Sequence, residues 1–262
     1  MLEKKEIYLF RRKIWEFYKK NKRDFPWRRT KNAYHILVSE IMLQQTQTER
    51  VRAKYKEFLS LFPDINTLAK ARVVDVLRAW QGLGYNRRAL FLKRTSEILI
   101  KEYNGRIPKD EDILKKFPGI GAGTAGALCA FAFNVPSIFI ETNIRRVYIH
   151  EFFTSKTSVS DKEIFEYIKI TIDKKNPREW YYALMDYGVF LGKERTKNPN
   201  TKSKHYKKQS RFSGSERQLR GKILKTALLY KKTAPLFISR KTGIDEKNTK
   251  RILYTLKSEG FL

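Results

Sequence analysis

The sequence is nearly devoid of cysteine and histidine, and this excludes several kinds of site. Cys129 is the only cysteine among 262 residues, so the chain can build no internal disulfide, no zinc cluster of thiolates and no cysteine-ligated iron–sulfur cluster. The thiol lies in the apolar run 127–131, which favours a buried, unreactive side chain. The three histidines, His35, His150 and His205, are scattered. We therefore expect no metal site and no cofactor.

Long apolar runs are lacking as well. No stretch of the sequence has the length or the flanks of a signal peptide or of a membrane-spanning helix. We therefore expect an intracellular protein, in the cytoplasm or nucleoid, that contacts no membrane.

Acidic residues are scarce relative to basic ones. The chain has 56 Lys and Arg against 27 Asp and Glu, which gives a formal net charge of +29. This excess is larger than solubility requires, and it predicts a polyanionic partner, most obviously nucleic acid. A thermophile surface rich in Lys and Arg, or a protein that binds membrane surfaces, are the alternatives.

The periodicity of apolar residues is helical almost throughout. Apolar side chains recur at helical spacing in segments such as 34–42 and 164–168, and no run of alternating strands is present. We predict an all-α protein with a main domain at 1–192, a basic linker at 193–214 and a small helical domain at 215–262.

The last segment has a helix-turn-helix pattern. An apolar stripe begins at Leu219, a short turn follows at Thr242-Gly243, and a second stripe runs from Thr249 to Leu256. Helix, glycine turn and helix in this order are typical of helix-turn-helix and winged-helix-like domains. A plain helical cap on the main domain is the alternative.

A glycine-rich segment, 117–125, lies between two predicted helices and reads Phe-Pro-Gly-Ile-Gly-Ala-Gly-Thr-Ala. Glycines allow the backbone to approach a phosphate closely, and N–H groups at the start of a helix point at the anion. The segment is typical of a helix-hairpin-helix element, which binds the DNA backbone without reading its sequence. A tight turn between core helices is the alternative. The expected DNA contacts are Gly119, Gly121, Gly123 and Thr124.

A second segment, 38–47, places one carboxylate in an otherwise apolar helix. Glu40 is costly there unless it is paired or functional. Burial would raise its pKa and let it act as a general acid near neutral pH. A solvated or ion-paired glutamate is the alternative, and this feature alone favours it.

Four motifs resemble one family. The sequence Ser-Glu-Ile-Met-Leu-Gln-Gln-Thr-Gln at 39–47 resembles the signature of the adenine glycosylases that act opposite 8-oxoguanine, the MutY family of the helix-hairpin-helix DNA glycosylase superfamily. Phe-Pro-Trp-Arg at 25–28, Gly-Leu-Gly-Tyr at 82–85 and Asn-Ile-Arg-Arg-Val at 143–147 resemble the same family. The similarity runs from about residue 8 to residue 191 and implies the two-lobed helical glycosylase fold.

The resemblance also implies roles for individual side chains. Glu40 matches the glutamate that protonates the adenine ring and so activates the leaving base. Tyr85 resembles a tyrosine that wedges beside the lesion, which offsets part of the cost of flipping a base out of the duplex. The segment at the gap and the opposite base is matched by Leu43, Gln44, Gln45 and Thr46, and the surroundings of the base pocket by Trp27 and Arg28.

A second carboxylate belongs to the expected chemistry. In this superfamily an aspartate two residues before an asparagine stabilises the oxocarbenium-like sugar by its negative charge. Here Glu141 and Asn143 occupy the two positions, so the charge is kept on a side chain that is one methylene longer. A salt bridge from Glu141 to Arg145, four residues later, is the alternative.

The sequence departs from the family at several places. Gly192 and a basic stretch stand where four cluster-binding cysteines are usual, and Tyr182 stands where a base-pocket glutamate is expected. Gly123 replaces the lysine with which bifunctional members cut the strand, which implies a monofunctional enzyme. The helix-turn-helix pattern takes the place of the separate domain that reads 8-oxoguanine. The basic stretch is expected to contact phosphates through Lys202, Lys204, Lys207 and Lys208.

The leading hypothesis is a monomeric, monofunctional adenine glycosylase of base excision repair, acting on double-stranded DNA with adenine opposite 8-oxoguanine or guanine. A glycosylase for mismatched thymine or uracil is the first alternative, and Glu40 argues against it because a ring nitrogen that accepts a proton suits purines best. A bifunctional glycosylase with lyase activity and a non-catalytic DNA-binding protein are the others. The pair Glu40 and Glu141 argues against the last.

Overall fold

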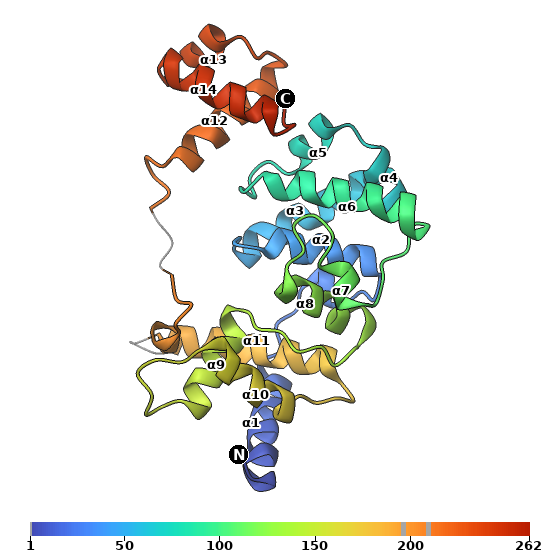
Figure 1. The fold of residues 1–262 in the computed structure, drawn as a ribbon, viewed down its shortest axis with the longest axis vertical. Coiled ribbons are helices and arrows are strands. Elements are labelled where there is room, and N and C mark those ends of the chain that lie inside the picture. Colours follow the sequence, from blue (N-terminus) through green and yellow to red (C-terminus); the bar gives the residue numbers. More distant parts are fainter. Residues whose placement is uncertain (1, 195–197, 208–210) are drawn as a thin grey trace. The chain divides into compact units, whose positions relative to one another are not determined.

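The computed structural model describes residues 2–194, 198–207 and 211–262, and the regular structure within these ranges is helical (Figure 1). An isolated parallel bridge joins Val159 and Ser203. The predicted all-α class is thus confirmed. The helices in chain order are α1 (Lys4–Asn21), η1 (Pro26–Arg28), α2 (Ala33–Leu43), α3 (Thr48–Leu61), α4 (Ile65–Lys70), α5 (Val73–Ala79), α6 (Arg87–Tyr103), α7 (Glu111–Leu114), α8 (Ala122–Phe133), α9 (Thr142–Phe152), α10 (Asp161–Thr171), α11 (Pro177–Glu194), η2 (Pro199–Lys202), α12 (Glu216–Tyr230), α13 (Pro235–Thr242) and α14 (Glu246–Ser258).

The chain packs as two compact units, each built from several segments. Unit 1 consists of Met1–Leu37, Pro108–Lys116 and Ile120–Lys208, and unit 2 of Val38–Ile107, Phe117–Gly119 and Gln209–Leu262. The chain boundaries at 192 and 214 stay predictions. None of the helices in the described part of the chain combines the length and the hydropathy that a membrane span needs.

Unit 1 has an aromatic core between α1, α9 and α11. Trp180 and Tyr148 are fully buried there, and Phe10 of α1 lies with its ring centroid 5.6 Å from that of Tyr148 and 5.8 Å from that of Trp180. Aromatic rings supply large buried areas per residue, so a few of them fix the packing of three helices. Helix α9, which has Glu141 as its N-cap, is packed against α1 and α11 by this core.

Unit 2 has a core formed by helices α3 to α6. Phe58 of α3 and Trp80, just after α5, are fully buried and meet edge to face at 5.6 Å. Leu99 of α6 is buried too, and α4 packs along α6. This core supports the loop at residues 82–85, between α5 and α6.

The C-terminal segment of unit 2 is a group of three packed helices, α12 to α14 (Figure 1, orange to red). Helix α13 ends at Gly243, whose φ of +67° is readily adopted by glycine. Helix α14 begins after Asp245, whose side chain accepts a hydrogen bond from the N–H of Asn248. The predicted order of helix, glycine turn and helix is therefore confirmed, and we call residues 215–262 the C-terminal helical group.

Candidate active site and DNA-contacting elements

Helix α2 carries Glu40 close to its C-terminal end. The helix starts after Asn32, whose Oδ1 accepts a hydrogen bond from the N–H of Tyr34 at 2.9 Å. Ser39 and Ile41 are buried, whereas Glu40 is partly exposed. The burial that the apolar pattern favours is therefore incomplete, and part of Glu40 is accessible to solvent.

The turn after α2 joins three of the segments that the sequence singles out. Gln45 is exposed and has a left-handed φ of +56°. The side chain of Gln44 donates a hydrogen bond to the carbonyl of Gly119 at 3.1 Å, and the hydroxyl of Thr46 donates to the carbonyl of Leu83 at 3.1 Å. The turn, the tip of the hairpin and the loop at 82–85 are thus connected within unit 2. Leu43, the last residue of α2, is partly exposed.

Arg88, in the first turn of α6, is a buried hub that sequence analysis missed. Its pKa is lowered to about 10 by burial, so the guanidinium remains charged at neutral pH. Nothing in the sequence distinguishes it from the many other basic residues, because its partners come from distant positions. The guanidinium donates hydrogen bonds to the carbonyls of Ile41, Met42, Gln44, Leu83 and Gly84 and to the hydroxyl of Thr46.

The hairpin is shaped by a glycine that no other residue could replace without strain. Gly119 has a φ of +75°, and a Cβ there would lie 2.8 Å from the Phe91 ring. The hydroxyl of Thr95 donates to the carbonyl of Pro118 at 3.2 Å, which fixes the same turn.

The hairpin continues into the 12-residue helix α8. Gly121 and Gly123 are exposed at its N-terminus, and Thr124 is partly exposed. The N-terminus of a helix attracts anions through its N–H groups and dipole, so this exposed start has the geometry that phosphate binding requires.

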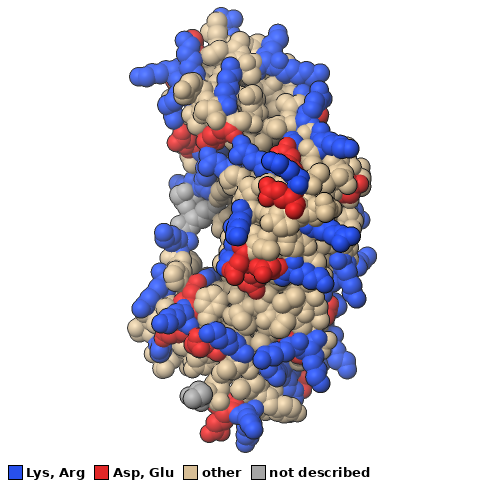
Figure 2. Space-filling model, turned by 45° about the vertical axis from the view of Figure 1, so that its right-hand side comes forward, with Lys and Arg blue, Asp and Glu red and all other residues tan. Residues whose placement is uncertain are grey.

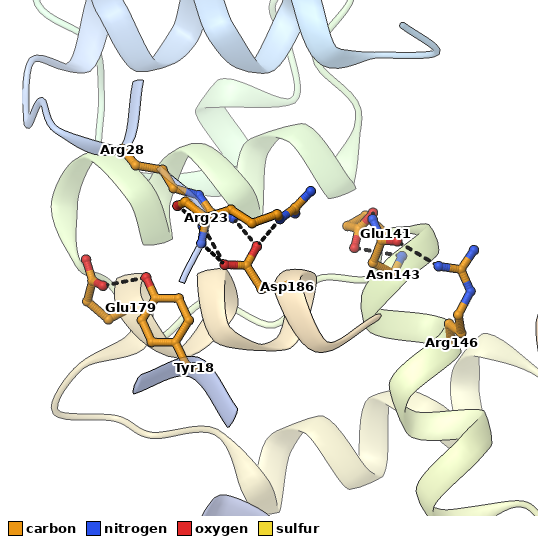
Figure 3. Close-up of polar contacts among 8 residues, drawn as sticks. All are labelled: Tyr18, Arg23, Arg28, Glu141, Asn143, Arg146, Glu179 and Asp186. Atoms are coloured by element: carbon orange, nitrogen blue, oxygen red, sulfur yellow. Dashed lines mark hydrogen bonds and ion pairs between the residues drawn. The ribbon is translucent and has the colours of Figure 1, made fainter. Parts of the chain in front are cut away.

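Glu141 is the N-cap of α9. Its Oε1 accepts hydrogen bonds from the N–H of Asn143 at 2.7 Å and of Ile144 at 2.8 Å. Its Oε2 accepts one from the side-chain amide of Asn143 at 3.2 Å (Figure 3). Burial raises the pKa of Glu141, and the two backbone N–H groups, with Arg146 and Arg145, offset part of that rise. The carboxylate is therefore fixed in orientation at a helix start.

The structure does not contain the ion pair between Glu141 and Arg145 that was the alternative role for Glu141. The guanidinium of Arg145 pairs instead with Asp161, with N–O distances of 2.8 and 2.7 Å. Arg146 lies on the Asn143 side: its Nη1 donates to Asn143 Oδ1 at 2.9 Å (Figure 3). Glu141, Asn143 and Arg146 thus form a short chain of hydrogen bonds.

Two glycines of α11 make room for this chain. A Cβ at Gly188 would lie 2.7 Å from the Cβ of Asn143 and would also clash with its carbonyl oxygen. A Cβ at Gly192 would lie 2.7 Å from Nη1 of Arg146. Arg146 also donates to the carbonyl of Gly188 at 2.7 Å. The close approach of α9 and α11 therefore requires glycine at 188, where the added Cβ meets backbone atoms, whereas a side chain at 192 would displace the guanidinium of Arg146.

Arg28, assigned to the surroundings of the base pocket, is engaged inside unit 1. Its two terminal nitrogens bind both oxygens of the buried Asp186 at 2.8 Å each, and Nη1 also donates to the carbonyl of Arg23 (Figure 3). Arg23 adds two hydrogen bonds to Asp186, at 2.6 and 3.0 Å. The guanidinium thus positions its neighbours, and Asp186 is a second residue that sequence analysis missed.

The aromatic residues assigned to the pocket are packed in stacks. Tyr182 is buried, and its ring stacks on that of Phe131 with 4.5 Å between the centroids. The guanidinium of Arg28 also lies against the Tyr182 ring, 4.4 Å from its centroid. Trp27 is buried and stacks on Phe25 at 5.0 Å. Both rings therefore help to hold Arg28 and its segment in place.

The lysines of the basic stretch differ in their surroundings. The ammonium of Lys202 donates to the carbonyls of Phe153 at 3.3 Å and Thr154 at 2.7 Å. Lys204 and Lys207 are exposed. Lys208 lies outside the described residues. Lys204 and Lys207 are thus better placed than Lys202 for a contact with an external anion.

Cys129 is buried, and its thiol donates to the carbonyl of Lys109 at 3.2 Å. Burial raises the pKa of the thiol to about 11, which keeps it protonated and unreactive. Within the described ranges no group of three or more His, Cys, Asp or Glu side chains could hold a metal ion. A single cysteine does not fit the four-cysteine iron–sulfur cluster that the family resemblance implies.

Comparison with known proteins places the chain in a family. Residues 38–172 match the model of the HhH-GPD superfamily of base excision DNA repair proteins. The chain belongs to this superfamily. It is 36% identical over 65% of its length to an adenine DNA glycosylase of Buchnera aphidicola, and 33% identical over 79% to one of Mycolicibacterium smegmatis. The matches cover 49% and 76% of those two proteins, so the chain spans about half the length of the first.

A solved structure has the same fold. The structure of a thermostable thymine-DNA glycosylase matches 73% of this chain and 90% of its own, with a TM-score of 0.65 and 25% identity. The helix-hairpin-helix glycosylase fold expected from the motifs is therefore confirmed.

Proposed function

We propose that the protein is a monofunctional adenine DNA glycosylase of base excision repair, acting on duplex DNA that holds a mismatched adenine. The observation that carries this proposal is the oriented carboxylate of Glu141, set beside Asn143 in a chain whose relatives are named adenine DNA glycosylases. On the face drawn in Figure 2, basic side chains are more abundant than acidic ones, which suits a polyanion.

Glu40 is proposed to protonate a ring nitrogen of the flipped adenine. The bond between the base and C1′ of the sugar then breaks, and its electron pair leaves with the neutral base. The sugar is left as an oxocarbenium-like cation. The partial exposure of Glu40 in α2 supports this role because the acid must reach a ligand.

Glu141 is proposed to stabilise that cation until water adds at C1′ and releases a proton. A fixed carboxylate stabilises developing positive charge without a reorganisation cost at the moment of reaction. The two N–H bonds to Oε1 and the contact of Oε2 with Asn143 supply this fixation.

Position 123 supports monofunctional chemistry. Gly123 lies exposed at the start of α8 and offers no amine for a Schiff base with the sugar. We expect excision to leave an abasic strand that breaks only after alkali or heat. Strand breaks that keep pace with base release without alkali would contradict this, and Gly123→Lys should raise trapping by borohydride if the position faces the sugar.

The experiment that tests the function is single-turnover excision from a panel of duplexes. The panel holds adenine opposite 8-oxoguanine, guanine and thymine, and thymine or uracil opposite guanine. Glu40→Gln should bind DNA as the parent does and lose excision by at least about a hundredfold, the scale of a general acid. Near-normal excision by Glu40→Gln would remove Glu40 from the mechanism.

Excision of mismatched thymine or uracil is the second candidate function. Two observations favour it: the similarity to a thymine-DNA glycosylase, and Tyr182 at the position where the adenine-specific family has a glutamate. In the panel, release of thymine or uracil without release of adenine would establish it in place of the first proposal.

A further inference from the structure

The loop at 82–85 displays one aromatic side chain at the surface. Tyr85 is 40% exposed and has a left-handed φ of +45°, which is strained for a residue with a side chain. Gly84 before it has a φ of +71°. Arg88 maintains this conformation: its backbone N–H donates a hydrogen bond to the carbonyl of Tyr85 at 3.0 Å, and its guanidinium lies 5.6 Å from the centroid of the Tyr85 ring. A strained, displayed aromatic residue indicates a role beyond packing.

The C-terminal helical group reaches this side chain. Nη1 of Arg217, in the first turn of α12, donates a hydrogen bond to the hydroxyl of Tyr85 at 2.6 Å. The guanidinium carbon also lies 5.7 Å from the centroid of the Tyr85 ring, within cation–π range. A residue 132 positions later in the chain thus engages both the hydroxyl and the ring of Tyr85.

Further contacts fix the C-terminal helical group where Arg217 can act. Glu259, just after α14, forms an ion pair with Arg87 of α6 at 2.6 Å and accepts a hydrogen bond from Arg220 of α12 at 2.6 Å. Arg78 of α5 donates to the carbonyl of Leu228 in α12 at 3.0 Å. Both ends of the loop at 82–85 are therefore connected to the C-terminal helices, through α5 before it and α6 after it.

We propose that Arg217 is a positioning residue that fixes the Tyr85 side chain for contact with distorted DNA, so that the C-terminal helical group takes part in lesion recognition. The proposal rests on the proposed function and on the place beside the lesion that the family resemblance implies for Tyr85. A ring held by a hydrogen bond and a neighbouring cation loses less conformational freedom when it stacks at an unstacked base step. Arg217 therefore acts through Tyr85 and not as a direct phosphate contact.

The test is a double-mutant cycle in the full chain, with Arg217→Ala, Tyr85→Phe and the double variant. The readout is the ratio of the dissociation constants for an undamaged duplex and for the same duplex carrying a tetrahydrofuran abasic-site analogue. Arg217→Ala and Tyr85→Phe are each expected to lower this ratio about threefold to tenfold, since each removes a charge-assisted contact. The double variant should lose no more than Arg217→Ala alone.

Two further variants distinguish positioning from a general effect on folding or charge. Arg217→Lys, which keeps a donor and a cation, should restore part of the ratio. Arg251→Ala removes an arginine of the same helical group that pairs with Glu216 at 2.8 Å, and it should leave the ratio unchanged. An equal loss with Arg251→Ala, or an undiminished effect of Arg217→Ala in the Tyr85→Phe background, would overturn the proposal.

The outcomes also separate this proposal from the proposed function. If the parent protein excises no base from any duplex while the binding ratios follow the expected cycle, the proposed glycosylase function is wrong and Arg217 is still a positioning residue. If the parent excises adenine and Arg217→Ala binds both duplexes as the parent does, the proposed role of Arg217 is wrong and the proposed function stands.

Discussion

At the scale of single residues, Glu141 combines the role of an N-cap with the charge that the proposed function requires. The longer side chain still reaches the N–H groups of residues 143 and 144, which is the work of an N-cap, and its second oxygen lies near the Asn143 amide. Arg146 in turn orients Asn143. Burial raises the pKa of Glu141, so its charged form costs folding free energy, which is the exchange of stability for activity that the proposed function predicts.

Glu141→Gln should separate the effect of the Glu141 charge on stability from its effect on excision. The pKa of Glu141 in the folded protein is raised above the ordinary value of 4.5. Ionisation of Glu141 therefore lowers the free energy of unfolding. This loss of stability is absent at pH values below 4.5 and grows as the pH rises toward the raised pKa of the folded protein. Glutamine keeps an oxygen for the N–H bonds, so the variant should be at least as stable as the parent at neutral pH. Excision should fall by at least about a hundredfold, as for other preorganised electrostatic groups.

Urea unfolding of parent and Glu141→Gln across the acid-to-neutral range measures the first effect, and single-turnover excision measures the second. Glu141→Asp, which keeps the charge, serves as the control and should retain part of the activity. A glutamine variant that loses stability relative to the parent as the pH rises would show that the charge stabilises the fold.

At the scale of helices, Arg88 connects the end of α2 to the start of α6. Its donors satisfy carbonyls at the C-terminal end of α2 that have no partner within the helix, and the positive charge suits that end of the helix dipole. Glu40 lies in the same turn of α2. The geometry of the candidate acid therefore depends on an arginine that need not touch the substrate.

Arg88→Ala should destabilise the protein by about 2–4 kcal/mol, since several buried carbonyls lose their donor at once. Arg88→Lys should be intermediate, because one ammonium cannot reach all of these carbonyls. Arg87→Ala is the matched control: this exposed neighbour pairs with Glu259, and its loss should cost at most about 1 kcal/mol. Urea unfolding measures all three, and equal losses for Arg87→Ala and Arg88→Ala would contradict the assignment.

Glycine substitutions test the approach of α9 and α11. Gly188→Ala should destabilise by about 1–3 kcal/mol, the cost of overpacking, because the added Cβ meets Asn143. Gly221→Ala in α12 is the control: nothing lies within 4 Å of its added Cβ, so it should stabilise by about 0.5–1 kcal/mol through helix propensity. Thermal unfolding of both variants checks the pair. A Gly188→Ala protein as stable as the parent would show that the two helices can move apart.

What the sequence could predict follows from the range of the interactions involved. The helices, the glycine hairpin and the turn at Gly243 depend on local periodicity and on backbone conformation, so the pattern was sufficient for them. The partnership of Arg28 with Asp186 spans 158 positions, and that of Arg88 with Ile41 spans 47. Such pairs form only when the helices pack, and one basic residue among 56 carries no sign of its partner.

At the scale of the whole molecule, the charge of +29 is the dominant physical property. Each phosphate that a lysine or arginine neutralises releases counterions, so affinity for duplex DNA should fall steeply with salt concentration. Charge alone does not say which side chains contact the DNA, because Lys and Arg occur over the whole visible face in Figure 2. The internal hydrogen bonds of individual lysines supply that distinction.

The lysines of the basic stretch offer the comparison. Lys204 and Lys207 are exposed, whereas the ammonium of Lys202 donates to the carbonyls of Phe153 and Thr154. Replacing Lys204 and Lys207 together by Gln should flatten the slope of log affinity against log salt by about 2 if both contact phosphates. Lys202→Gln, which removes the same kind of charge from the same stretch, should leave the slope unchanged because its ammonium is held by two carbonyls of the protein. Fluorescence anisotropy with a labelled undamaged duplex at several salt concentrations measures the three slopes. A flattened slope for Lys202→Gln, or an unchanged one for the double variant, would mean that the DNA path does not follow the exposed ammonium groups of this stretch.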